Sequence, residues 1–131
     1  MKYLLLMTAT KAGCEQLLHA WPQDKMLEHV GYMMNLNREL RAEGSLVAAE
    51  GLAFPHEAKV VTAGPDDTPV TDGVFPETKE FLMGYWIVDV ENAEAAYAIA
   101  ARASMAPPPP TVQGRIPIEV RQIMAGPPVD L

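Results

Sequence analysis

The chain has 131 residues, of which 49% are hydrophobic and 21% are charged, a balance typical of one folded domain rather than of a disordered chain. With 10 basic and 17 acidic residues the net charge is −7, which argues against sequence-independent binding to nucleic acid or to an anionic membrane. The single cysteine, Cys14, excludes an internal disulfide and a cysteine-based zinc cluster. We expect one domain over residues 1–131, with a loose tail at 125–131.

The N-terminal residues look superficially like the leader of an exported lipoprotein. The apolar run Tyr3–Met7 is five residues long, whereas the apolar region of a signal peptide has roughly 7–15. No window of the sequence approaches the roughly 18 apolar residues of a membrane span. The sequence therefore predicts a soluble, cytoplasmic protein whose first strand starts almost at the initiator methionine.

The first part of the chain reads as a strand, a loop and a long helix. Residues 2–8 form an apolar run that suits a strand. Residues 9–22 show no sustained period and contain glycine and proline, so we expect a loop there. A helix is predicted from Asp24, which is a suitable N-cap, to Gly44, which is a suitable stop.

The predicted helix is amphipathic and carries two polar groups on its apolar side. At 100° per residue its apolar side chains fall on one arc. Asn37 lies near the centre of that arc and His29 lies at its edge. The apolar residues of the arc are Met26, Val30, Met33 and Leu40.

Two strands and a hairpin are predicted after this helix. Residues 46–54 read as a strand in which Gly51 marks a bulge or a point of close approach. The runs 58–63 and 70–75 are joined by the turn-forming residues GPDDTP and predict a β-hairpin. Residues 84–90 are aromatic and β-branched, as expected of a buried strand.

The last part of the chain predicts a second helix and a final strand. An alanine-rich helix starts at Asn92 or Glu91 and runs to about Ser104. The proline run 106–110 cannot continue a helix and predicts an extended connector. Residues 116–124 alternate as a strand, and Pro117 favours an edge position. The expected inner face of the second helix is Ala96, Ile99, Ala100 and Ala103.

The order of elements predicts a ferredoxin-like α+β sandwich. It reads β-α-β, a hairpin, then β-α-β, which places helices on one face of an antiparallel sheet. The strand at 84–90 is apolar on both sides, so the other face of the sheet must also be covered. With only two helices available, we expect a homodimer in which two sheets pack face to face.

One segment resembles the signature of a known family. Residues 70–86 read VTDGVFPETKEFLMGYW, with six identities within nine positions, followed by Gly84-Tyr85. This pattern resembles the DGPF family of the YCII-related group, as do MKYLLLM at the start, LVAAEGLA and IEVRQI. Val74 and Gln122 stand where the family pattern has proline. The six identities are Asp72, Gly73, Phe75, Glu77, Lys79 and Glu80.

The resemblance implies a dimeric α/β barrel built on the ferredoxin-like unit, but it does not supply an activity. Some proteins similar to the DGPF family are associated with extracytoplasmic-function sigma factors. Related YCII-like proteins include a dehydrochlorinating lyase thought to use a His–Asp pair and no cofactor. The late Asp-Pro-aromatic motif of that group has no counterpart before the last strand of this chain.

Two residues are candidates for acid–base catalysis. His29 has an ordinary pKa near neutrality, which suits proton transfer, although a partly covered structural histidine would read the same way. Asp72 either acts as an acid–base group or, at the end of a strand, bonds to its own backbone. Glu50 shares a strand face with Leu46, and if that face is buried it needs Arg121 or a bound ligand as partner.

The remaining candidates are ligand-binding residues. Asn37, Glu50 and Trp86 are expected to line a cleft between helix and sheet. Glu77 and Lys79 lie between two strands, where they either touch a ligand or form a solvated charged run. We expect no metal and no cofactor, because the three histidines lack ligand spacing and no nucleotide motif is present.

Two functions remain open at the level of the sequence. The first is a cofactor-free enzyme of the lyase, isomerase or hydrolase type, acting on a small molecule through His29 with Asp72 or Glu50. The alternative is a non-catalytic accessory or ligand-sensing module, linked to sigma-factor regulation as the resemblance implies. Convergence of these three residues in one pocket favours the enzyme, and divergence favours the module.

Overall fold

The computed structural model describes residues 1–73 and 79–126, apart from the side chains of residues 16–19. Its main sheet has four antiparallel strands in the order β2-β5-β1-β6. This is the ferredoxin-like order, so the predicted fold is confirmed. The strands are β1 (Lys2–Thr10), β2 (Leu46–Gly51), β5 (Glu80–Asp89) and β6 (Ile118–Gln122).

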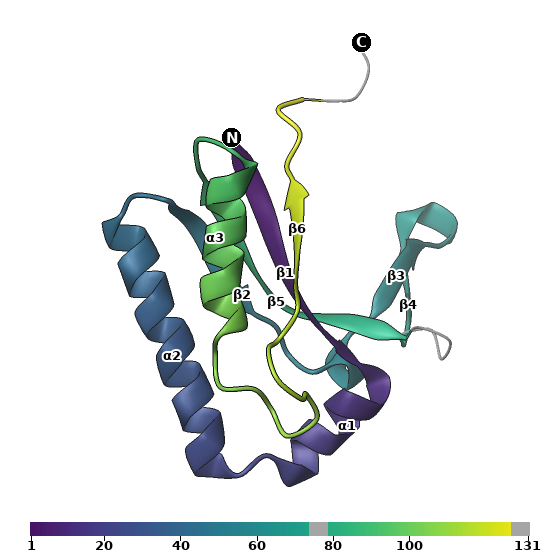
Figure 1. Ribbon diagram of the computed structural model, residues 1–131. Helices are drawn as coiled ribbons and strands as arrows, with labels where there is room; N and C mark the ends of the chain where they lie inside the picture. The colour runs from purple at the N-terminus through teal and green to yellow at the C-terminus, as the bar shows by residue number, and fades with distance from the viewer. Residues whose placement is uncertain (74–78, 127–131) are drawn as a thin grey trace.

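Two helices, α2 (Gln23–Ala42) and α3 (Ala93–Ser104), cover one face of this sheet (Figure 1). The predicted inner face of α3 is confirmed, because all four of its residues are buried. Asn92 is the N-cap, as predicted, and its Oδ1 accepts a hydrogen bond from Ala95 N at 2.9 Å. The core between helices and sheet comprises Tyr3, Leu5, Leu36, Leu40, Trp86, Val88 and the buried face of α3.

Strand register separates a covered face of the sheet from an open one. Tyr3 pairs with Val88 and Leu5 pairs with Trp86, and these four side chains lie under the helices. Side chains alternate along a strand, so the intervening pairs lie on the other face. No described helix or strand covers that face, which carries Leu4, Leu6, Tyr85 and Ile87.

The loop predicted over 9–22 is wrong, because a helix, α1 (Lys11–Ala20), follows β1 directly. Thr10 caps this helix, with its Oγ1 accepting from Gly13 N at 3.0 Å. Gly13 is itself in the first turn, and a glycine there lowers the helical signal of the sequence. The cap and the packing of α1 against β1 outweigh that propensity.

The long helix is confirmed with two corrections. Asp24 is not the N-cap: Pro22 holds that position without a side-chain hydrogen bond, and Asp24 lies in the first turn. Gly44 ends the helix as predicted, with φ at +80°, a backbone conformation that glycine adopts without steric cost. Met26 and Val30 are 39% and 43% exposed, so the buried stripe is shorter than expected and runs from Met33 to Leu40.

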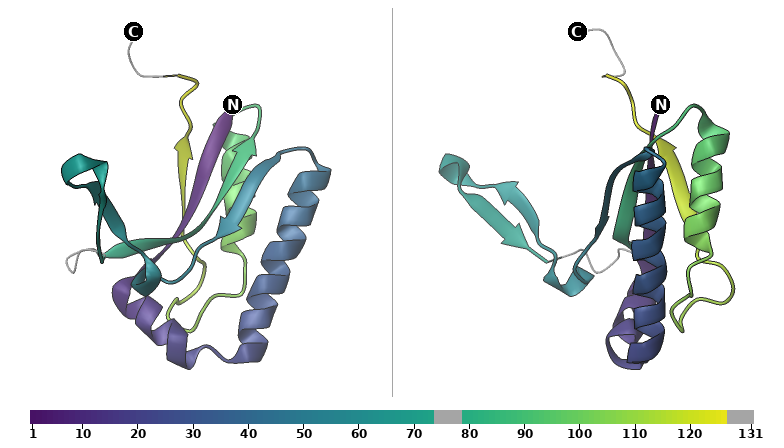
Figure 2. Two further views of the ribbon diagram at one scale, coloured as in Figure 1. Left: turned by 180° about the vertical axis from the view of Figure 1, so that it is seen from behind. Right: turned by 90° about the vertical axis from the view of Figure 1, so that its left-hand side faces the viewer.

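The predicted hairpin is confirmed as a separate two-stranded sheet. It consists of β3 (Val60–Ala63) and β4 (Pro69–Asp72). The single turn η2 (Pro65–Asp67) joins the two strands, and the single turn η1 (Pro55–Glu57) precedes β3. All of β4 and most of β3 is exposed. Figure 2 shows the hairpin standing away from the sheet, on the side opposite to α3.

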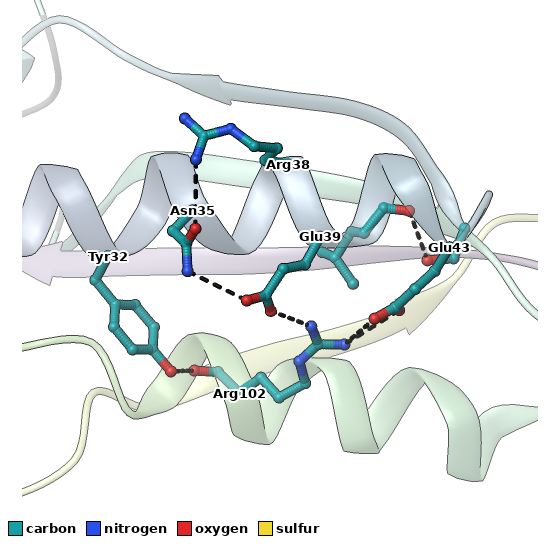
Figure 3. A network of polar contacts seen from close by, with 8 residues as sticks. Tyr32, Asn35, Arg38, Glu39, Glu43 and Arg102 are labelled. Carbon is teal, nitrogen blue, oxygen red and sulfur yellow. Dashed lines mark hydrogen bonds and ion pairs between the residues drawn. The ribbon is translucent and has the colours of Figure 1, made fainter.

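A polar network joins α2 to α3 at their exposed edge (Figure 3). Arg102 donates to Glu39 at 2.8 Å and to Glu43 at 3.2 Å. Hydrogen bonding to Glu43 raises the pKa of the Arg102 guanidinium further above its usual range. Tyr32 Oη donates to the backbone oxygen of Arg102 at 2.8 Å.

None of the helices in the described part of the chain has the length and apolar composition needed to cross a bilayer.

Candidate functional site

A cleft of about 170 Å³ lies between α2 and the β2–β5 side of the sheet. Its walls are mainly apolar and include Met33. Four of the predicted site residues line it: His29, Asn37, Glu50 and Trp86. The structure therefore brings together four of the seven candidate residues of the sequence.

His29 is held in one orientation by its surroundings. Its Nδ1 lies 2.8 Å from the backbone oxygen of Pro107, in the connector that follows α3. Because a carbonyl oxygen only accepts hydrogen bonds, Nδ1 carries the proton, so in the neutral form of the ring the lone pair lies on Nε2. The ring also contacts Trp21 edge to face, with centroids 5.1 Å apart. The helix supplies the residue, and the connector determines its tautomer.

Asn37 is oriented by Trp86. The indole Nε1 donates to Asn37 Oδ1 at 2.8 Å, which fixes the direction of the amide. The Nδ2 group of Asn37 then remains available as a donor, because its oxygen is already used. Trp86 is 5% exposed, so this hydrogen bond also satisfies a donor that the core would otherwise leave unpaired. Trp86 thus contributes an apolar wall and orients a polar neighbour.

Glu50 lies at the rim of the cleft, and the prediction that it shares a strand face with Leu46 is wrong. The residue is exposed. The register shifts between Leu46 and Ala48, so Leu46 pairs with Val88 on the covered face while Glu50 pairs with Tyr85 on the other face. Among the described residues Glu50 makes no ion pair with Arg121, which lies on β6 at the far edge of the sheet.

Asp72 lies outside the cleft. It is the last residue of β4, it is exposed, and its Oδ1 accepts from Gly73 N at 2.9 Å. The backbone interpretation of Asp72 agrees with this contact, and a pairing with His29 in one pocket is not found. Lys79 is exposed and is absent from the cleft wall. Glu77 lies outside the described residues.

The sequence interpretation missed the part of the site that a β-bulge creates. The register of β1 and β5 jumps from Met7–Gly84 to Thr8–Leu82, so Met83 is an extra residue in its strand. Bulges re-aim side chains and are frequent beside functional sites. Here both Met7 and Met83 line the cleft. No periodicity in the sequence signals this bulge.

Gly84, not Gly51, is the point of close approach between strands. A Cβ on Gly84 would lie 3.1 Å from the backbone oxygen of Glu50, whereas a Cβ on Gly51 would meet no atom within 4 Å. Adding a side chain at Gly84 would therefore push β2 away from β5. The bulge predicted at Gly51 is wrong, since the shift in β2 falls between Leu46 and Ala48.

Other reactive groups do not form a second centre in the described residues. No group of three or more histidine, cysteine, aspartate or glutamate side chains is gathered there in a way that would hold a metal ion. Cys14 is buried, and burial, together with the nearby Glu15, raises the pKa of its thiol. A neutral thiol is a poor nucleophile, and Cys14 Sγ instead contacts Met83 Sδ at 3.7 Å.

The family model of the YCII-related domain matches residues 1–108, a range that contains both helices that cover the sheet and every residue that lines the cleft. No curated protein matches the chain.

Proposed function

The chain belongs to the YCII-related family, and within it we propose that this protein binds a small molecule in the His29 cleft and transfers a proton on it without a cofactor. The supporting observation is the contact between His29 Nδ1 and the backbone oxygen of Pro107. In the neutral ring this contact leaves the lone pair on Nε2, and an unprotonated acceptor of this kind is what a general base requires. A histidine fixed this way needs no carboxylate partner to set its tautomer.

The surroundings of His29 favour a substrate with a polarised C–H bond. In the proposed step a proton leaves carbon for Nε2, and its electron pair forms the double bond of an enolate. Negative charge then develops on the carbonyl oxygen, and Asn37 Nδ2 supplies a hydrogen-bond donor to it. Met7, Met33 and Met83 make the wall apolar, which strengthens such a hydrogen bond.

Deuterium exchange tests this function without knowledge of the natural substrate. Methyl ketones from acetone to 4-phenylbutan-2-one would be incubated with the protein in D₂O, and loss of the C–H signal beside the carbonyl would be followed by NMR. We expect exchange that His29→Gln slows by about 10²- to 10⁴-fold. Asp72→Asn is the matched control and should retain the wild-type rate, because its carboxylate lies outside the cleft.

The ligand-sensing alternative makes the opposite prediction. Its support is the exposed position of Asp72 outside the cleft, which leaves Glu50 at the rim as the carboxylate of the wall to serve with His29. In that case a ketone would shift the signals of His29 on binding, yet no exchange above the buffer rate would occur.

A second copy of the chain is the partner that we propose for the open face of the sheet. That face carries Leu4, Leu6, Tyr85 and Ile87, and contiguous apolar surface of this kind favours association. The hairpin extends on the same side of the sheet, so it would flank a second copy seated there (Figure 2).

Light scattering tests the dimer. We expect a solution mass of two chains, and we expect Ile87→Glu to reduce it to one. Met105→Glu is the control, since Met105 is 51% exposed and lies at the end of α3, on the other side of the sheet. A wild-type protein that remains monomeric at millimolar concentration would contradict the proposal.

A further inference from the structure

A second cavity of about 320 Å³ adjoins the cleft. Three residues line both spaces: Met7, His29 and Met83. The imidazole that we propose as the base therefore stands at the boundary of two chambers. We call the space beside Asn37 the small chamber and the adjoining cavity the large chamber.

The large chamber is lined chiefly by flat and apolar side chains. Trp21 and Phe54 supply aromatic rings, and Pro109 and Val112 supply the wall formed by the connector. The indole Nε1 of Trp21 is buried and has no hydrogen-bond partner among the described residues. A cavity of roughly 150 Å³ lined by apolar side chains holds benzene, so the large chamber has room for a substituted ring. The small chamber has room for a short chain of atoms.

The connector after α3 contacts His29, which lines both chambers, and also forms part of the wall of the large chamber. Pro107 fixes His29 through its backbone oxygen, and two residues later Pro109 already lines the large chamber. Thr111 lies beside the start of α1, since its Oγ1 would be 3.7 Å from a Cβ on Gly13. The segment that orients the base is thus the segment that shapes the adjoining space.

From this juxtaposition we propose that the substrate has two parts, a planar ring that occupies the large chamber and a short carbonyl-bearing arm that reaches past His29 to Asn37. The inference rests on the proposed function and names its substrate class. The reacting C–H bond lies in the arm, next to the carbonyl, where the two chambers meet. Burial of the ring contributes binding energy, and the arm carries the C–H bond and the carbonyl group that react.

Methionine methyl groups report which chamber is occupied. In protein labelled with ¹³C at its methionine methyls, Met33 lines only the small chamber, while Met7 and Met83 line both. Met34 and Met105, 58% and 51% exposed, are internal controls. The probes are 4-phenylbutan-2-one, its arm alone as butan-2-one, and its ring alone as toluene. We expect 4-phenylbutan-2-one to bind at least about tenfold more tightly than butan-2-one, because it buries a ring.

Two matched pairs of variants separate the chambers. Val112→Trp fills the large chamber, and Gln113→Trp places the same side chain on the exposed neighbour. Gly51→Leu fills the small chamber from a position where a Cβ meets no atom within 4 Å. Gly31→Leu is its control, at an exposed glycine of α2 with equally open surroundings.

The outcomes distinguish this inference from the proposed function. We expect Val112→Trp to weaken the binding of 4-phenylbutan-2-one about tenfold and to leave the affinity for butan-2-one unchanged. We expect Gly51→Leu to weaken the binding of both ketones. If butan-2-one exchanges its protons through His29 but the ring adds no affinity, or if Val112→Trp behaves like Gln113→Trp, the two-part substrate is wrong and the proposed function stands. If no ketone shifts Met7, Met33 or Met83, both are wrong. A Val112→Trp protein that fails to fold leaves the decision to the affinity ratio of the two ketones in the wild type.

Discussion

The body of the molecule and its hairpin differ in almost every physical respect. In the body, α2 and α3 bury one face of the main sheet, and Leu5, Leu40 and Val88 are fully enclosed. In the β3–β4 hairpin nearly every residue is exposed, including Val61 at 56% and Val70 at 50%. An isolated two-stranded hairpin is marginally stable, so this one depends on the body and on whatever covers it.

The most distinctive stretch of the sequence and the residues that form the candidate site therefore lie in different regions of the molecule. The residues that resemble a family signature start in the hairpin, where the side chain of Asp72 accepts a hydrogen bond from the next backbone nitrogen. The residues that meet in the cleft come from α2, β2 and β5.

The largest effect is expected from a core truncation. Leu5→Ala removes a fully buried side chain and leaves a cavity, which should lower the free energy of unfolding by about 2–5 kcal/mol. Val61→Ala in the hairpin should change it by less than about 0.5 kcal/mol, because the side chain is already exposed. Urea unfolding of both variants measures the difference. Equal losses would mean that the hairpin is buried in an assembly as thoroughly as the body.

A smaller effect is expected at the wall of the cleft. Asn37→Leu removes the acceptor of the Trp86 Nε1–H bond and leaves a buried donor unpaired, at a cost of about 1–3 kcal/mol. Asn35→Leu is the matched control, since Asn35 bonds only to exposed partners and should cost less than about 0.5 kcal/mol. Tryptophan fluorescence during unfolding reports both variants. Equal free energies of unfolding for the two variants would show that water accepts the hydrogen bond of Trp86 Nε1 in place of Asn37 without loss of stability.

Arg102→Gln tests the link between the two helices. It breaks the pairs with Glu39 and Glu43, whose side chains are more than half exposed, so the loss should stay below about 1 kcal/mol. The difference from wild type should shrink further in 1 M salt, because screening weakens exposed ion pairs. A loss that is independent of salt would point to packing of the Arg102 stem instead.

Asp72→Asn should have almost no effect on stability. The amide oxygen can still accept the hydrogen bond from Gly73 N, and the side chain is exposed, so we expect a change within about 0.5 kcal/mol. Thermal unfolding measures it. A large loss would reveal a partner for Asp72 that the isolated chain does not contain.

A change that appears only at high pH is expected at Cys14, which lines a pocket together with Phe54 and Phe81. Burial raises the pKa of its thiol above the ordinary value of 9.0. The neutral form is therefore favoured in the folded state, and its contribution to stability is complete below pH 9 and declines as the pH rises further. Unfolding curves of wild type and Cys14→Ala should differ by a constant amount up to pH 9 and converge above it.

Local patterns were sufficient for the elements with a clear period or a recognised cap. The α3 helix was predicted with its cap at Asn92 and its buried alanine face, and the hairpin followed from turn-forming residues between two β-like runs. The α1 helix was not predicted, because Gly13 in its first turn hid the cap at Thr10. Propensity within a short window fails here because a local capping hydrogen bond and the packing of α1 against β1 together outweigh it.

The order of elements along the chain predicted the ferredoxin-like fold, and the resemblance of residues 70–86 to a signature predicted the family. The position of His29 and Asn37 on one side of a helix followed from a periodicity within one element, which a chain displays without its neighbours. The three-dimensional structure was needed to show that Glu50 faces away from the core, that Met83 enters the cleft, and that Asp72 lies outside it. A register shift, a bulge and a projecting hairpin set those three positions, and each is a relation between strands that no single strand encodes.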